Sequence, residues 1–193
     1  MRKVIYSHMV SVDGFIETDE SYQGPNWATT DQELLIHFKE IESLCDIHLY
    51  GRRVFQAVST WWPIADKDPN APDYVVEYSK IWKDKLKYVF STTLDHADWN
   101  TKVIKENAPD VVKELKSQEG KDMFLYGGTL ASSLMQFNLI DEFRLYYNPV
   151  FIGNGTPMIP SMEGVFRLKL VETKVFGCGV VLLRYSNQKL LQT

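Results

Sequence analysis

The chain has 193 residues, of which 45% are hydrophobic and 24% are charged, a composition typical of one globular domain. Its net charge of −4, without any basic run, argues against a nucleic-acid or membrane partner. No stretch is long and apolar enough to cross a bilayer, and the first residues lack a secretory-signal pattern, so we expect a cytoplasmic protein.

The first half of the chain alternates predicted strands and helices. Residues 3–10 mix β-branched and aromatic side chains and predict a strand, which a glycine-containing loop over 11–29 follows. Thr30 and Glu33 have the spacing of a capping box, so a helix is expected from there to about Leu44. After it we expect a strand over 46–50, a helix from 51 to about 60, an irregular segment over 61–72, a helix over 73–84, and strands over 87–91 and 101–105.

The second half of the chain ends in strands only. Residues 107–118 predict a helix with Pro109 in its first turn, and Gly120 ends it. Next we expect a strand over 122–126, a helix over 129–137, and strands over 141–148, 164–175 and 178–186. This order predicts a single three-layer α/β domain, with a mostly parallel sheet, helices on both faces and an antiparallel C-terminal strand.

The end of the second predicted strand carries residues suited to phosphate. Gly51 allows a close turn, and the helix that begins after it offers free N–H groups and the positive end of its dipole. Arg52 and Arg53 stand at that helix start, where guanidinium groups bind phosphate oxygens in a bidentate way. An ordinary solvated corner is an equally good interpretation of this pattern alone.

Two further strand ends have a similar character. Ser91, Thr92 and Thr93 place three hydroxyl groups just past a strand, where they can bond phosphate or ribose oxygens. Gly127 and Gly128 separate a strand from a helix and permit close backbone approach to a ligand. Simple turns remain the alternative, but open α/β sheets bind ligands past the carboxyl ends of their strands.

Other residues give weaker or negative signals. Asp13 and Gly14 form a turn at the end of the first strand, and Trp27 follows in the same loop; both also suit purely structural roles. The four histidines are scattered without ligand-like spacing, so we expect no metal site. Cys45 and Cys178 belong to no CxxC pair and are expected to be reduced, largely buried thiols.

The order of six short segments resembles the dihydrofolate-reductase-like superfamily, and in particular its bacterial branch related to the reductase domain of riboflavin biosynthesis. These segments span nearly the whole chain and cover residues 11–16, 49–55, 89–94, 125–128, 139–142 and 149–155. The resemblance implies a mostly parallel sheet with a reversed C-terminal strand, NADPH across its carboxyl edge, and a homodimer with its interface at the C-terminal strands.

The resemblance also implies roles for individual residues. Arg52 and Arg53 would hold the adenosine phosphates, with Arg53 at the 2′-phosphate, and the backbone of Val10 would bond the nicotinamide carboxamide. The full set implied to contact NADPH is Val10, Gly51, Arg52, Arg53, Ser91, Thr92, Thr93, Tyr126, Gly127, Gly128, Thr129 and Leu130. The residues expected to border the substrate are Asp13, Phe15, Trp27, Leu34, Leu35 and Phe38.

The resulting hypothesis is hydride transfer from NADPH to a small heterocycle, pyrimidine or pterin-like, with Asp13 or an ordered water supplying the proton. Dihydrofolate is not the expected substrate, because the acidic residue of true dihydrofolate reductases aligns with Leu34 or Leu35, both apolar. A non-catalytic NADP-binding homodimeric module or sensor is the alternative, and a purely structural dimer is a third. The hypothesis requires the corners at Gly51, Ser91 and Gly127 to converge on one groove.

Overall fold

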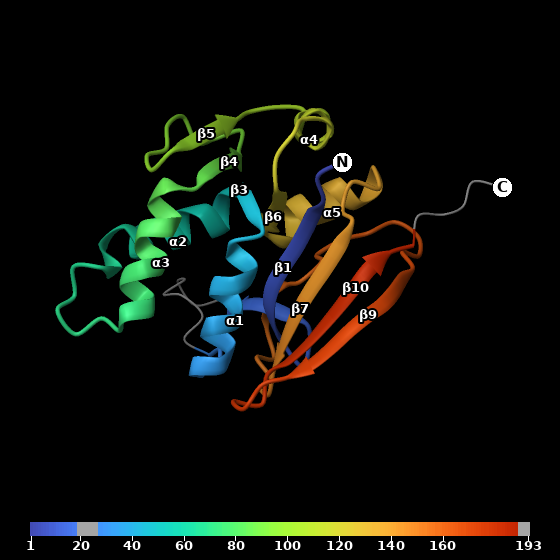
Figure 1. Ribbon diagram of the computed structural model, residues 1–193. Helices are drawn as coiled ribbons and strands as arrows, with labels where there is room; N and C mark the ends of the chain where they lie inside the picture. The colour runs from blue at the N-terminus through green and yellow to red at the C-terminus, as the bar shows by residue number, and fades with distance from the viewer. Residues whose placement is uncertain (19–26, 189–193) are drawn as a thin grey trace.

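The computed structural model describes residues 1–18 and 27–188, which form one eight-stranded sheet, a small two-stranded sheet and five helices. The large sheet has the strand order β5-β4-β3-β6-β1-β7-β10-β9 (Figure 1). Its strands are β1 (Val4–Ser11), β3 (Cys45–Gly51), β4 (Leu86–Phe90), β5 (Thr101–Ile104), β6 (Asp122–Tyr126), β7 (Glu142–Asn148), β9 (Leu168–Val175) and β10 (Val181–Asn187).

The sheet is parallel from β5 to β7, and β10 then runs antiparallel to both of its neighbours. On one face lie α1 (Gln32–Glu42), α2 (Arg52–Ala65) and α3 (Asp73–Asp84), and on the other lie α4 (Ala108–Ser117) and α5 (Gly128–Gln136) (Figure 1). This arrangement confirms the predicted fold class. No helix in the described ranges is long and apolar enough to span a membrane.

Hydrophobic side chains from alternate strand positions fill a core on each side of the sheet. Beneath α4 and α5, Leu49 and Leu125 pack with Val112 and Leu134. Beneath α1, a second cluster forms around Phe124. Because successive strand residues point to opposite faces, strands buried between two helical layers are apolar on both faces.

The start of α1 differs from the capping-box expectation by one residue. The N-cap is Asp31, whose carboxylate accepts a hydrogen bond from Leu34 N at 2.8 Å. The same carboxylate accepts Cys178 N at 2.7 Å, so it joins the helix to the turn between β9 and β10. This tertiary contact favours Asp31 over Thr30 as the cap.

The end of α2 lies five residues beyond the expected Thr60, so the segment predicted to be irregular begins later. Pro63 is inside the helix, but in its last turn, where only one backbone bond is lost. The Trp62 ring packs on Tyr78 of α3 at 4.4 Å, and Ser79 Oγ donates to the Trp62 carbonyl at 2.7 Å. Packing between α2 and α3 therefore overrides the proline signal.

A two-stranded sheet was not expected from the sequence. β2 (Phe15–Thr18) pairs antiparallel with β8 (Gly155–Pro157), and Met158 N donates to Gly14 O at 2.9 Å. The loop predicted over 11–29 therefore contains a strand, and its residues 19–26 lie outside the described part of the chain. This small sheet fastens the segment after β1 to the segment after β7.

Candidate functional site

The three predicted phosphate corners lie at one edge of the large sheet. β4, β3 and β6 are neighbouring parallel strands, with Gly51 in register with Phe90 and Tyr50 in register with Tyr126. The corners that follow these strands therefore begin side by side, at the carboxyl edge. The three corners thus share one edge, as the hypothesis requires, whereas the common groove and the binding roles of the individual residues stay predictions.

Two of these corners are in contact with each other. A Cβ atom on Gly127 would lie 3.5 Å from Gly51 Cα, and Gly127 itself has φ = +108°, which favours glycine. Gly51 and Gly127 are the N-cap residues of α2 and α5; as glycines they offer no side-chain cap, and of these two only the Gly127 N–H has a side-chain acceptor among the described residues, His8 Nε2. Two helix N-termini with uncapped N–H groups therefore stand next to each other, an arrangement that favours an anion.

The charges at the start of α2 also favour an anion. Arg52 and Arg53 occupy its first turn, which holds no acidic residue, although the helix dipole disfavours cations at this end. Arg52 Nη1 donates to Gln56 Oε1 at 2.9 Å, and Arg53 is exposed and has no polar partner within the described ranges. A negatively charged ligand would relieve this unfavourable arrangement.

The hydroxyl groups at the third corner differ in exposure and in role. Ser91 is buried, and its Oγ accepts Leu94 N at 2.9 Å and Thr93 N at 3.2 Å, so it shapes the turn. Thr92 and Thr93 are exposed. These two hydroxyls, rather than that of Ser91, are accessible to a ligand at this corner.

β1 extends beyond the end of its pairing with β6 at the same edge. Pairing of β1 with β6 ends at Tyr6, whereas its pairing with β7 continues to Ser11. The backbone of Val10 therefore has one side that β6 does not cover, but Val10 is 0% exposed, so a carboxamide could reach it only if the neighbouring side chains move.

His8 is a positioning residue of this edge that the sequence reasoning missed. Its Nε2 accepts Gly127 N at 2.8 Å, so it ties β1 to the corner before α5. Burial lowers the pKa of His8 to about 4, which keeps the ring neutral and this nitrogen able to accept. Its position in an ordinary alternating strand gives no sequence signal for this contact.

Asp13 lies in the turn between β1 and β2. Its carboxylate accepts Gly153 N at 2.7 Å and Ile152 N at 3.1 Å, and so holds the loop after β7. The pKa of Asp13 is lowered, first by a hydrogen bond from Ser11 and further by these backbone donors. Asp13 is therefore ionised at neutral pH.

The predicted substrate wall on α1 needs a correction at one position. Leu34 is fully buried in a cluster with Ile5, Phe124 and other core residues, so it has no surface for a ligand. Its role is to pack beneath the predicted substrate wall. Leu35 and Phe38 keep partial exposure, as do Phe15 and Trp27 in the segments near the end of β1.

Comparisons with known proteins agree with this architecture. The family model of the RibD C-terminal domain matches residues 2–182. The uncharacterized protein YyaP of Bacillus subtilis is 35% identical over 185 residues, which cover 95% of this chain and 94% of YyaP. The 2,5-diamino-6-ribosylamino-4(3H)-pyrimidinone 5′-phosphate reductase of Archaeoglobus fulgidus is 67% identical over 47 residues, only 24% of this chain and 22% of that protein.

A solved structure shares the fold. Dihydrofolate reductase from Enterococcus faecalis, in complex with NADP(H) and RAB-propyl, superposes with a TM-score of 0.63 at 13% identity, over 97% of each chain. The predicted likeness to dihydrofolate-reductase-like and riboflavin-reductase-like proteins is confirmed by these comparisons.

Proposed function

The chain belongs to the RibD C-terminal domain family, and we propose that it is an NADPH-dependent reductase of a small, flat heterocycle. The observation that carries this proposal is the contact between two uncapped helix N-termini, at Gly51 and Gly127, beside two arginines. In support, the Enterococcus faecalis enzyme binds NADP(H) and the Archaeoglobus fulgidus enzyme is named for a pyrimidinone 5′-phosphate. We therefore propose a pyrimidine-like or pterin-like substrate.

The residues at this edge fit the phosphates of a dinucleotide. The backbone N–H groups at the start of α5 and α2 would bind the pyrophosphate, and Arg53 would bind the 2′-phosphate. Thr92 and Thr93 would bond phosphate or ribose oxygens at the neighbouring corner, and Val10 the carboxamide. When bound, NADPH supplies the hydride, and the protein's part is to hold the substrate against it and exclude water.

The proton that follows the hydride needs a source. An ionised Asp13 orients groups by accepting hydrogen bonds, but it holds no proton to donate at neutral pH. Of the two donors considered from the sequence, we therefore favour an ordered water, with Asp13 as the residue that fixes the loop around it.

Replacing Arg53 with alanine tests the cofactor assignment. We expect NADPH affinity to fall about 10–100-fold, the value of one lost charge-assisted contact, with NADH affinity unchanged. Titration of both cofactors, followed by their fluorescence, measures the two affinities. Lys67→Ala removes the same charge from an exposed site just beyond α2 and is the matched control.

Two results would contradict this proposal. An Arg53→Ala protein with wild-type preference for NADPH would remove the 2′-phosphate assignment. Tight NADPH binding without oxidation against a panel of pyrimidines and pterins would favour the non-catalytic module instead.

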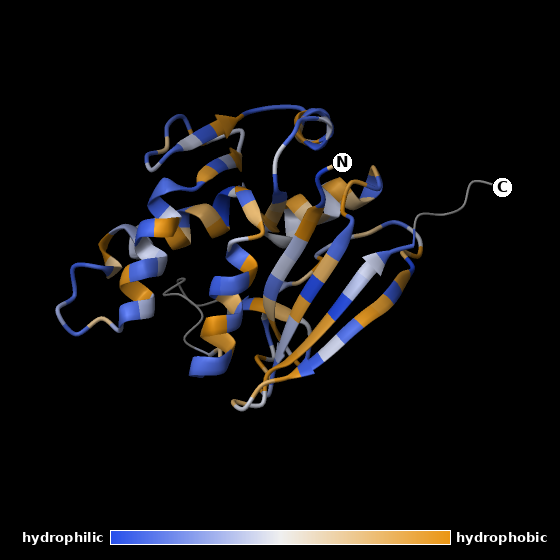
Figure 2. Cartoon of the chain, in the orientation of Figure 1, coloured by the Kyte–Doolittle hydropathy of each residue, from blue (hydrophilic) through white to orange (hydrophobic). Residues whose placement is uncertain are grey.

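The C-terminal edge of the sheet supports the expected homodimer. Among the described strands β9 pairs with β10 alone, and its Leu170, Val171 and Val175 are 52%, 50% and 69% exposed. Hydrophobic residues mark this strand in Figure 2, and exposed apolar edge strands are natural pairing sites. We propose that two copies of the chain associate through β9.

Val175→Lys should therefore convert a dimer to a monomer at micromolar concentration, because it buries a charge in the interface. Sedimentation velocity measures the change. Ile36→Lys adds the same charge to an apolar residue of α1 that is 51% exposed, and it should leave the dimer intact. A wild-type protein that sediments as a monomer would end the proposal.

A further inference from the structure

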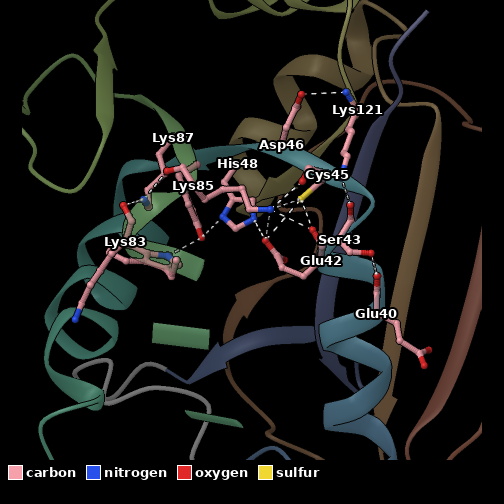
Figure 3. A network of polar contacts seen from close by, with 12 residues as sticks. Glu40, Glu42, Ser43, Cys45, Asp46, His48, Lys83, Lys85, Lys87 and Lys121 are labelled. Atoms are coloured by element: carbon pink, nitrogen blue, oxygen red, sulfur yellow. Dashed lines mark hydrogen bonds and ion pairs between the residues drawn. The ribbon is translucent and has the colours of Figure 1, made fainter. Parts of the chain in front are cut away.

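Three side chains of metal-binding type meet where α1 passes into β3 (Figure 3). Glu42 is the last residue of α1, Cys45 is the first of β3, and His48 follows in the same strand. Glu42 Oε1 lies 2.5 Å from His48 Nε2 and 3.6 Å from Cys45 Sγ. The three candidate ligand atoms all lie within 4.8 Å of one another.

A β-bulge brings two of these side chains to the same face. Cys45 and His48 are three positions apart, and in a regular strand they would point to opposite faces. The register of β3 against β6 shifts between Cys45 and Ile47, with Asp46 as the extra residue. Such bulges re-aim side chains, and here the result is a compact cluster from one short stretch of chain.

The cluster is buried, and further side chains orient its histidine. Glu42, Cys45 and His48 are 3%, 2% and 0% exposed. The other ring nitrogen of His48, Nδ1, lies 3.3 Å from Tyr50 Oη, and Trp82 Nε1 donates to that same oxygen at 3.2 Å. Metal-binding histidines are oriented in this way, through a hydrogen bond from the nitrogen that does not face the metal.

A cation already lies among the three groups. Lys85 Nζ is 3.2 Å from Glu42 Oε1 and 3.7 Å from Cys45 Sγ, and it donates to the Cys45 carbonyl at 2.8 Å. The Lys85 side chain is 12% exposed, so part of it is in contact with solvent. The buried groups thus attract positive charge at the point where a metal ion would lie.

We propose that Glu42, Cys45 and His48 bind a divalent transition-metal ion of the zinc class, which takes the place of the Lys85 ammonium. One oxygen, one sulfur and one nitrogen ligand suit Zn²⁺ or Co²⁺, and tetrahedral bond lengths require ligand atoms about 3.3–3.6 Å apart. The Cys45–Glu42 distance meets this spacing, and the Glu42–His48 pair has to open by about 1 Å.

The exchange balances in charge and protons. The ion binds the Glu42 carboxylate and the Cys45 thiolate, the thiol proton is released to water, and Lys85 turns outward with its charge. Two anions then neutralise the dication, just as Lys85 and Glu42 neutralise each other without it. Three side chains leave the fourth tetrahedral position to a water molecule that enters with the ion. The ion would tie the end of α1 to β3, the strand that leads to Gly51.

Cobalt titration of the full-length, chelator-stripped protein tests the site, and its readout does not depend on reductase activity. We expect one equivalent of Co²⁺ to give a thiolate-to-cobalt charge-transfer band, and Zn²⁺ to abolish it. Cys45→Ser should lose the band, and His48→Gln should weaken binding at least about 10-fold. Lys85→Met should bind more tightly than wild type, since the competing ammonium is gone.

Cys178→Ser and His96→Gln are the matched controls, and both should keep the band. Circular dichroism of each variant separates loss of binding from loss of fold. A wild-type protein without a band, or a band that persists in folded Cys45→Ser, would overturn the proposal. Binding by Lys85→Met alone would also overturn it, because Lys85 would then be the permanent cation of the cluster.

Discussion

Gly128→Ala should lower the free energy of unfolding by about 1–3 kcal/mol, the usual cost of overpacking. A Cβ atom at Gly128 would lie 2.6 Å from Met158 O and 2.9 Å from Pro157 O. Both are backbone atoms, so the chain itself has to move. The affected segment pairs with β2 through Phe15 and Pro157, and we therefore expect weaker cofactor binding as well.

Urea unfolding, followed by circular dichroism, measures this loss as a lower midpoint at unchanged slope. Gly51→Ala is the matched control for stability, because the nearest atoms to its Cβ lie 3.8 Å away. Alanine is a poorer N-cap residue than glycine, which lowers stability, but it also restricts the unfolded chain more, which raises stability. These two effects on the free energy of unfolding cancel to within about 1 kcal/mol. Equal midpoints for Gly128→Ala and wild type would show that Met158 O does not crowd this glycine.

The convergence of the phosphate corners could be predicted because it follows from topology alone. Once strands alternate with helices, right-handed crossovers make the strands parallel, and their carboxyl ends share an edge. The corners at Gly51, Ser91 and Gly127 could therefore be predicted from local sequence alone. At each of them a predicted strand is followed by small or hydroxyl residues. No knowledge of side-chain packing was required.

Contacts between distant segments could not be predicted in the same way. β2 and β8 are short, and their pairing depends on where β1 and β7 end rather than on any local pattern. The choice of Asp31 over Thr30 as helix cap depends on Cys178 N, far along the chain. A single sequence carries no signal for such partners.

The Glu42, Cys45 and His48 cluster illustrates a third kind of limit. Cysteine pairs and histidine spacing are the usual sequence signals of a metal site, and neither signal includes a glutamate at a helix end. The bulge at Asp46, which turns Cys45 toward His48, has no glycine or proline to mark it. Because nothing in the sequence marks this bulge, it could not be predicted that Cys45 and His48 lie on the same face of β3.

Glu142→Gln should cost about 3–5 kcal/mol of stability, because it breaks a buried ion-pair network. Glu142 Oε1 accepts Arg144 Nε at 2.7 Å and Arg184 Nε at 2.8 Å, and Arg184 also donates to Oε2. These arginines are cross-strand neighbours on β7 and β10. Without the carboxylate between them, two like charges face each other in a largely buried place.

The pH dependence of stability gives this prediction an independent check. Burial raises the pKa of Glu142, but hydrogen bonds from Arg184 and Arg144 outweigh it and hold the folded-state pKa below its usual value. A depressed pKa contributes stability above the unfolded value of about 4.3, which is lost as pH falls through the folded one. Wild type should therefore lose stability in acid more steeply than Glu142→Gln.

Glu172→Gln provides the matched comparison for both measurements. Glu172 also pairs with Arg184, at 3.1 Å, but its side chain is 44% exposed, so its removal should cost less than about 1 kcal/mol. Urea midpoints measured from pH 7 downward should then separate the two variants at neutral pH and bring Glu142→Gln toward wild type in acid. Parallel curves for wild type and Glu142→Gln would mean that the two arginines do not depend on this carboxylate, since protonation of Glu142 and its replacement by an amide remove the same charge.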